Sequence, residues 1–149
     1  MEWLEHRIPP PLVAVFLGIL MWLPARPLPP FGGRLWLALL VLLGGIAVCL
    51  AGVLSFRRAR TTVNPLKPET ASSLVVAGIY RYTRNPMYLG FAIVLLAWSI
   101  ALASLPALLG VVAFVLYMNR FQIGPEEQAL RRRFGANFDA YCRRVRRWV

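Results

Sequence analysis

Three stretches without a charged residue constrain the fold of this chain more than any other feature. The longest regular one, Leu35 to Phe56, is 22 residues long and contains no Asp, Glu, Lys or Arg. At about 1.5 Å per residue, a helix of this length crosses a hydrocarbon layer of ~30 Å. Hydrophobic residues make up 58% of the 149, above the roughly 45–50% typical of soluble domains. We therefore predict a single all-α membrane domain, 1–149, with a spanning helix at 35–56.

The other two stretches predict three more membrane segments. Residues 12–24 form a shorter apolar run, and we expect a retained helix there. A cleaved signal peptide is the alternative, but the chain starts with acidic residues and lacks a small-residue cleavage site. The 30 uncharged residues from 89 to 118 exceed one ordinary span, and Pro106 near their middle starts a helix more readily than it continues one. We predict a short helical hairpin of 89–103 and 106–120, which makes four membrane helices.

The charged residues orient these helices. The chain has a net charge of +11, and its basic residues gather in the segments 57–88 and 121–149, beside the hydrophobic blocks. Because cytoplasmic loops of membrane proteins are enriched in Lys and Arg, we expect both segments and both termini to be cytoplasmic. The excess of Arg over Lys suggests a bacterial inner membrane. This placement favours the lipid bilayer as the partner and excludes nucleic acid.

The sequence offers few groups for metal or triad chemistry. Cys49 lies within an apolar run, Cys142 lies in the basic tail, and His6 is the only histidine. Zinc sites need several Cys or His ligands together, and a Ser-His-Asp triad needs a histidine near its nucleophile. We therefore predict no metal site.

The sequence "GIYRYTRNPMYLG", residues 78–90, is polar and aromatic and precedes the longest uncharged run. Asn85 followed by Pro86 is typical of a helix start, with Asn capping a backbone N–H. One interpretation makes the three Tyr an interfacial belt and the Arg side chains partners of lipid phosphate. The other is a ligand site, because a helix N-terminus beside Arg84 binds an anion such as a carboxylate.

The C-terminal tail contains the only acidic pair near the end of the last membrane segment. Glu126 and Glu127 either compensate a helix dipole, with Glu127 also paired to Arg131, or bind a cationic ligand. Apolar residues then recur every three or four positions among many Arg, which predicts a C-terminal amphipathic helix that lies on an anionic membrane surface. They are Leu130, Phe134, Phe138, Tyr141, Val145 and Trp148.

These two segments carry a resemblance to a known family. Tyr80 with "RNPMYLG" (84–90), then "EEQALRRRFG" (126–135) and Tyr141, resembles the isoprenylcysteine carboxyl methyltransferases and the related phospholipid methyltransferases. The upstream "TTVNP" (61–65) and "LVVAGIY" (74–80) resemble the same family. The resemblance covers about the C-terminal two thirds of the chain.

The resemblance implies an integral membrane enzyme that transfers a methyl group from S-adenosylmethionine to a lipophilic acceptor. It implies a substrate-side catalytic role for Arg120, at the end of the last membrane segment. By position, it implies that the cofactor is bound by Leu74, Val75, Gly78, Tyr80, Arg84, Asn85, Pro86, Met87, Tyr88, Glu126 and Glu127.

Two departures from the family pattern bear on the acceptor. Asn85 stands where the family usually has His, and Phe138 stands where it usually has Tyr. A carboxylate acceptor is already ionised and needs no base, whereas an amine must lose a proton. We therefore expect methylation of the carboxylate of an isoprenylcysteine-like substrate or of another small amphiphile. The alternatives are a phospholipid amine N-methyltransferase and a non-catalytic membrane protein with a lipid-binding basic tail.

Overall fold

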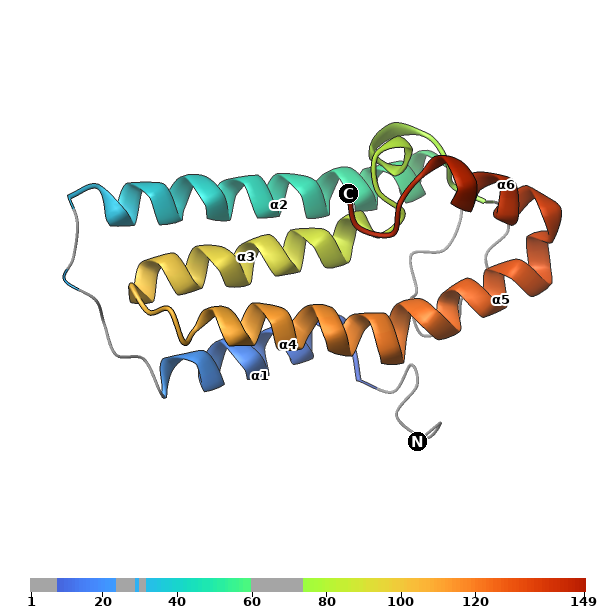
Figure 1. Ribbon diagram of the computed structural model, residues 1–149. Coiled ribbons are helices and arrows are strands. Elements are labelled where there is room, and N and C mark those ends of the chain that lie inside the picture. Colours follow the sequence, from blue (N-terminus) through green and yellow to red (C-terminus); the bar gives the residue numbers. More distant parts are fainter. Residues whose placement is uncertain (1–7, 24–28, 30–31, 60–73) are drawn as a thin grey trace.

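The computed structural model describes residues 8–23, 29, 32–59 and 74–149, and these residues form helices and no strand (Figure 1). Four apolar helices run side by side: α1 (Pro10–Trp22), α2 (Arg34–Arg58), α3 (Pro86–Leu102) and α4 (Leu108–Met118). Helix α3 packs against the other three, and α1 also packs against α4. The prediction of an all-helical fold is confirmed. His6 and the segment "TTVNP" lie outside the described residues.

Within the described part of the chain, two helices are long and apolar enough to cross a membrane: α2 and a continuous 27-residue helix, Leu108–Phe134. Helices α1 and α3 are apolar but shorter. Large side chains on the outer surface of α2 are exposed, including Trp36 at 76% and Leu40 at 68%. Exposed apolar surface on this scale is typical of a lipid-facing helix. The span at 35–56 agrees with α2, whereas a total of four spanning segments remains a prediction.

Helices α2 and α3 approach each other closely because glycines line their contact. A side-chain carbon at Gly45 would lie 2.9 Å from the carbonyl oxygen of Gly90, and one at Gly90 would collide with Cys49 Sγ. The Cys49 thiol also donates a hydrogen bond to the carbonyl of Met87, at 3.3 Å. Small residues allow such backbone approach between membrane helices. This contact fixes the start of α3 against α2.

The predicted turn between two apolar helices is present, although only the first of the two helices is short. Helix α3 begins at Pro86 and ends at Leu102, where Ala103 takes a left-handed conformation with φ of 48°. The turn passes through Pro106, and α4 begins at Leu108. The helix start at Asn85–Pro86 is therefore as predicted, although the Asn85 side chain makes no capping hydrogen bond.

The last membrane helix does not end near residue 120. It continues from α4 through a π-helical turn, η4 (Asn119–Ile123), into α5 (Gly124–Phe134). In this turn the N–H of Gly124 donates to the carbonyl of Asn119. Proline inside a helix lacks a donor and clashes with the carbonyl four residues earlier. The wider π-helical turn directly before Pro125 lets the helix continue past that residue.

The prediction of one amphipathic helix at the C-terminus is wrong. The chain breaks at Gly135, whose φ is 50°, and α6 (Ala136–Arg144) folds back from α5 (Figure 1). The apolar stripe then faces the protein: Phe138, Tyr141 and Val145 form a buried cluster, against which Leu74 and Leu130 pack. Glycine adopts a positive φ without the cost that a side chain would add, so this residue allows the reversal.

Candidate active site

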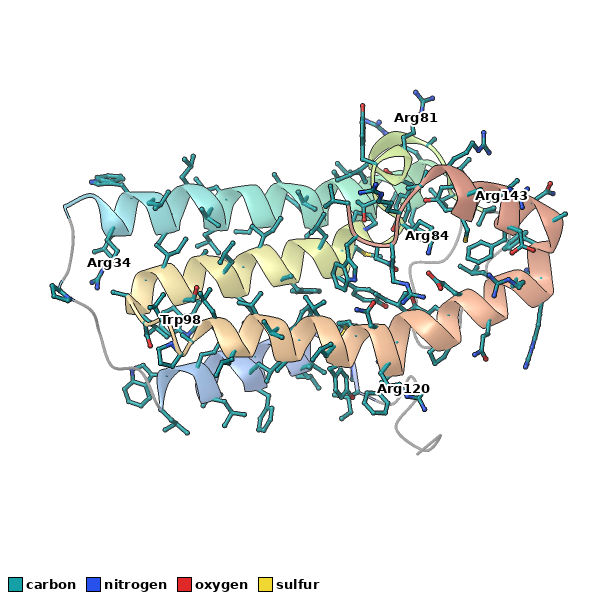
Figure 2. All side chains as sticks on the ribbon, viewed as in Figure 1. Arg34, Arg81, Arg84, Trp98, Arg120 and Arg143 are labelled. Carbon is teal, nitrogen blue, oxygen red and sulfur yellow. The ribbon has the colours of Figure 1, made fainter. Side chains whose placement is uncertain are left out.

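The two motifs predicted from the sequence meet at one end of the helices. The short 3₁₀ helix η3 (Gly78–Arg81) and the start of α3 lie at the same end of the helices as α5 and α6 (Figure 1). Arg81, Arg84 and Arg143 all lie at this end, whereas Arg34 lies at the other (Figure 2). We call the first the Arg-rich end. The expectation that the two basic segments share one side agrees with this arrangement.

Tyr88 and Glu126 make the first direct link between the motifs. The Tyr88 hydroxyl donates a hydrogen bond to Glu126 Oε1. Tyr88 is 5% exposed, so its hydroxyl needs an internal partner. Glu126 lies in the charged part of the long helix, two turns beyond Met118, where the apolar part ends. Burial raises the pKa of the Glu126 carboxyl, and the hydrogen bond from Tyr88 opposes this rise.

Arg84, Glu127 and Arg147 make the second link. Arg84 Nη2 lies 2.7 Å from Glu127 Oε1, and Arg147 Nη2 lies 2.6 Å from Glu127 Oε2. Burial alone would raise the pKa of Glu127, but the hydrogen bonds from Arg147 and Arg84 hold this pKa below its ordinary value. The two guanidinium groups outnumber the one carboxylate, so the trio retains a net positive charge. Arg131 pairs instead with Asp139 at 2.8 Å, and the suggested pairing of Glu127 with Arg131 is wrong.

The last five residues, which we call the C-terminal clamp (Val145–Val149), bind both motifs. Arg84 Nη1 donates to the carbonyls of Cys142 and Val145, at 3.2 and 3.0 Å. The backbone N–H of Arg84 donates to the carbonyl of Arg146 at 3.0 Å. Asn85 Nδ2 donates to the carbonyl of Arg147 at 2.9 Å instead of accepting at the helix N-terminus. Carbonyl groups of the protein thus accept hydrogen bonds from most of the N–H groups of Arg84 and Asn85 that we expected to bind a ligand anion.

The remaining residues before α3 surround this centre. Tyr80 is buried, its ring packs edge-on against Phe56 at 5.4 Å, and its carbonyl accepts a hydrogen bond from the Tyr141 hydroxyl at 2.8 Å. Burial raises the pKa of Tyr141, so this hydroxyl stays protonated and donates. Gly78 has φ of 64°, and a side-chain carbon there would lie 2.8 Å from Ser55 Oγ. Glycine is therefore required at this bend.

The other predicted residues are placed less uniformly. Val75 and Pro86 are buried, Leu74 packs on the cluster of α6, and Met87 takes part through its carbonyl group. Arg120 is exposed and its guanidinium lies 5.7 Å from the ring centre of Phe121. Its side chain points away from Arg84 (Figure 2). The structure therefore does not bring Arg120 into this group.

Sequence reasoning missed Arg147 and Asn119. The Asn119 side chain accepts hydrogen bonds from Arg147 Nη1 at 3.4 Å and from Trp148 Nε1 at 3.1 Å. Arg147 is one of seven Arg in the tail, and nothing in its spacing separates it from the others. Asn119 could have been found from its position, because it is the first polar residue after the apolar helix α4 and lies two turns before the acidic pair. No group of three or more possible metal ligands occurs among the described residues.

The fold and the site define an all-helical protein of membrane type, with a partly buried cluster of Tyr, Arg and Glu at one end of its apolar helices. A family model described as phospholipid methyltransferase matches residues 33–137, most of the chain. The protein belongs to this family of membrane methyltransferases, and the resemblance found in the sequence is confirmed.

The chain is also similar to a curated protein over part of its length. An uncharacterized protein of Haemophilus influenzae is 44% identical over 63 residues, which are 42% of this chain and the whole of that protein. No solved structure matches the chain.

Proposed function

We propose that the protein transfers a methyl group from S-adenosylmethionine to a lipophilic acceptor at the Arg-rich end of its membrane helices. The observation that carries this proposal is the direct contact between the two motifs: Tyr88 with Glu126, and Arg84 with Glu127. Family membership supports methyl transfer as the reaction. We infer the identity of the cofactor and of the acceptor from the chemistry of the side chains in the candidate site.

The residues present fit the polar end of this cofactor. Arg84 Nε is buried and has no hydrogen-bond acceptor among the described residues, and a ligand carboxylate accepts well from such a donor. Tyr88 is the one described residue that donates to Glu126, and it uses only Oε1. Glu126 Oε2 is then suited to accept from an ammonium group. When bound, S-adenosylmethionine supplies a methyl group on a positively charged sulfur.

The chain's own residues position and shield the reacting groups. The C-terminal clamp fixes Arg84 and Glu127, while the rings of Tyr80 and Tyr88 provide buried, rigid walls. Methyl transfer to an anion removes charge toward the transition state, so a dry and fixed site favours it. A carboxylate acceptor of an isoprenylcysteine-like molecule, or of another small amphiphile, needs no further group.

One observation favours a second acceptor class, the amine of a phospholipid. An amine must lose a proton before or during methylation. Burial raises the pKa of Glu126, which makes its carboxylate a stronger base than an exposed Glu. In this version Glu126 Oε2 accepts the proton of the amine. A non-catalytic protein with a lipid-binding tail is the remaining alternative, and it predicts no cofactor binding.

The membrane arrangement is also part of the proposal. We propose that all four apolar helices of the domain are embedded in a bacterial inner membrane and that the Arg-rich end is cytoplasmic. The acceptor then enters from the lipid, and the cofactor enters from the cytoplasm.

Calorimetric titration of the purified protein in detergent with S-adenosylmethionine and S-adenosylhomocysteine tests the cofactor. Glu126→Gln keeps an acceptor for Tyr88 but removes the charge, and a charge-assisted hydrogen bond is worth about 1.5–3 kcal/mol. We expect affinity to fall by about ten-fold or more. Asp139→Asn is the matched control, because Asp139 lies at the surface and pairs with Arg131 rather than with a residue of the proposed site. Absence of binding to the unchanged protein would refute the cofactor assignment.

Isolated membranes incubated with methyl-labelled cofactor then separate the acceptor classes. A base-labile methyl ester in the labelled lipid or thioether indicates a carboxylate acceptor, whereas a stable methylated headgroup amine indicates a phospholipid.

A further inference from the structure

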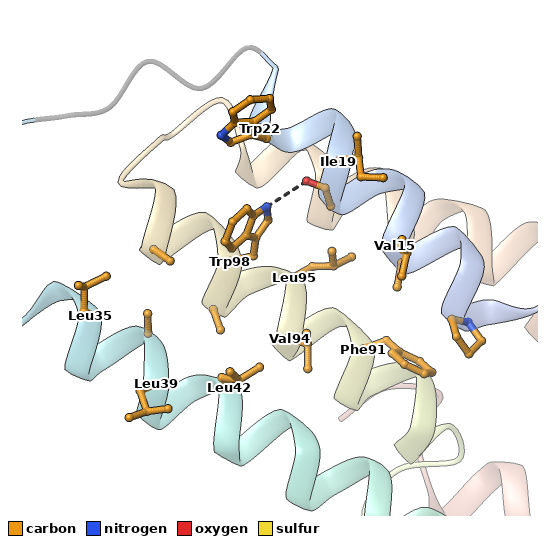
Figure 3. A pocket seen from close by; sticks show the side chains of 16 residues that line it. Val15, Ile19, Trp22, Leu35, Leu39, Leu42, Phe91, Val94, Leu95 and Trp98 are labelled. Carbon is orange, nitrogen blue, oxygen red and sulfur yellow. Dashed lines mark hydrogen bonds between the residues drawn. The ribbon is translucent and has the colours of Figure 1, made fainter.

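An apolar groove lies between α1 and α2, with α3 as its floor (Figure 3). Its volume is about 840 Å³, within the range of ligand-binding cavities. Helix α1 packs on α3 and α4, and α2 packs on α3, so the groove is the space left between α1 and α2. All its lining side chains are apolar, among them Ala14 and Gly18 of α1, Leu39 and Leu42 of α2, and Phe91 and Leu95 of α3.

The groove is continuous with the lipid-facing surface. Val15 and Ile19 on its α1 side are 60% and 59% exposed, and Leu35 and Leu39 on its α2 side are 64% and 42% exposed. A hollow lined only by apolar groups does not hold water well. In a bilayer, the hydrocarbon chains of lipids surround the protein and can fill this hollow.

The length of the groove matches one leaflet. Its floor runs along α3 from Phe91 to Ala101, which is about 15 Å at the helical rise. The hydrocarbon core of a bilayer is ~30 Å thick. A single lipid chain from one leaflet therefore fits along the floor.

An arginine side chain, that of Arg34, lies at the end of the groove that is farther from the Arg-rich end. Arg34 is four residues before Ala38, so the two share a face of α2, and Ala38 lines the groove. Figure 2 shows Arg34 at this end, with its side chain directed toward the side of α2 where α3 lies. Its side chain has no ion-pair partner in the described part of the chain. A lipid phosphate complements this charge.

Two tryptophans mark the same end. Trp22 and Trp98 line the groove there, and Trp98 Nε1 donates to the carbonyl of Gly18 at 3.0 Å (Figure 3). Tryptophan is enriched at the boundary between lipid chains and headgroups. The far end of the groove therefore lies at headgroup level, opposite the Arg-rich end.

We propose that this groove binds one glycerophospholipid of the leaflet opposite the Arg-rich end. One chain lies along α3 between α1 and α2, and the phosphate pairs with Arg34. This lipid is distinct from the methyl acceptor, because its polar end lies at the opposite end of the helices from Glu126. It fills the space between α1 and α2, which both pack on α3.

Native mass spectrometry of the detergent-purified protein, titrated with phosphatidylglycerol, measures the lipid bound per chain. A side-chain carbon at Gly18 meets only Leu95 Cδ2, at 3.9 Å, so Gly18→Leu extends into the groove. We expect it to weaken binding by about ten-fold or more, since the chain loses buried methylenes. Gly44→Leu is the matched control, because nothing lies within 4 Å of a side-chain carbon at Gly44.

A second pair of variants tests the headgroup. Arg34→Gln should weaken binding several-fold, whereas Arg58→Gln, at the other end of α2, should not. If Gly18→Leu does not fold, Ala101→Val fills the far end of the floor and takes its place. If the groove variant that folds, Gly18→Leu or Ala101→Val, binds phosphatidylglycerol as tightly as the unchanged protein does, the proposed site for the lipid chain is refuted. Equal effects of Arg34→Gln and Arg58→Gln overturn the assigned leaflet and the phosphate contact.

Discussion

Glu127 holds two arginine side chains that come from distant parts of the sequence, and this arrangement determines which groups remain for a ligand. Arg84 lies before α3, and Arg147 is the third residue from the end of the sequence. The side chain of Glu127 is 14% exposed and that of Arg84 is 13% exposed, so the pair that they form is not an ordinary surface ion pair. Both terminal nitrogens of Arg84 are engaged within the protein, and Nε is the side-chain nitrogen that has no acceptor among the described residues.

Arg147→Gln tests whether the C-terminal clamp serves the site. The change removes the hydrogen bonds from Arg147 Nε and Nη2 to Glu127 and leaves Arg84 as its partner. We expect affinity for S-adenosylhomocysteine to fall by about ten-fold, because Glu127 and Arg84 lose their fixed geometry, while the unfolding temperature changes little. Calorimetry and thermal unfolding in detergent measure the two effects.

Arg146→Gln is the matched control for this clamp. Arg146 is exposed and takes part through its backbone carbonyl, which the substitution preserves. Unchanged affinity in both variants would mean that the clamp only holds the fold. Arg147→Lys should restore part of the binding, since it keeps the charge but loses the planar fork of donors.

The sequence indicates both partners of the contacts Tyr88–Glu126 and Arg84–Glu127, but not which residue pairs with which. Glu126, Glu127, Arg84 and Tyr88 stand out because polar residues are rare beside long apolar runs. Which carboxylate meets which donor depends on how α5 passes α3, a tertiary contact between residues about 40 positions apart. The Asn85 side chain likewise binds the carbonyl of Arg147 rather than its own helix.

At the scale of elements, the contact between α2 and α3 sets the position of Tyr88 and Arg84 along the axis of α2. Pro86 and Met87 pack against Gly52, and Gly90 packs against Gly45 and Cys49. Helix α3 cannot move along α2 without breaking these close approaches. The start of α3, and with it half of the site, is therefore positioned by glycines in the middle of apolar helices.

Gly90→Ala should disturb this contact. The added carbon would collide with Cys49 Sγ and lie 2.7 Å from the carbonyl oxygen of Gly45, so the helices must separate. Overpacking of this kind costs about 1–3 kcal/mol, and we expect a lower unfolding temperature in detergent. Gly44→Ala, where the new carbon meets nothing within 4 Å, should be neutral or slightly stabilising. Equal unfolding temperatures for the two variants would contradict the close packing.

The elements that could be predicted are those with a local cause. The hairpin follows from the length of the uncharged run and from Pro106, and the start of α3 follows from Asn85–Pro86. The continuation of α4 into α5 could not be predicted, because Pro125 normally ends a helix and a π-helical turn gives no clear sequence signal. The reversal at Gly135 was missed because the apolar spacing continues across it in register.

At the scale of the whole molecule, the two ends of the helices differ in charge. Arg57 and Arg58 end α2, and α5 and α6 end with five more Arg, all at the Arg-rich end. Arg34 is the basic residue among the described residues at the opposite end (Figure 2). The sequence predicts this separation because its charges fall between the apolar runs. The proposed lipid site lies at the Arg34 end, and the proposed methyl-transfer site lies at the Arg-rich end.

Cysteine labelling in intact cells tests that orientation. Gly32 and Ala136 are exposed and lie on opposite sides of the apolar helices, and Cys142→Ser removes the native thiol of the tail. If the Arg-rich end is cytoplasmic, Gly32→Cys should react with a membrane-impermeant maleimide in intact cells, and Ala136→Cys should react only after the membrane is opened. The parent chain, in which Cys49 lies within α2, should stay unlabelled in intact cells. The opposite pattern would place the Tyr88–Glu126 pair outside the cytoplasm, where the proposed cofactor is not supplied, and would therefore count against both the orientation and the proposed reaction.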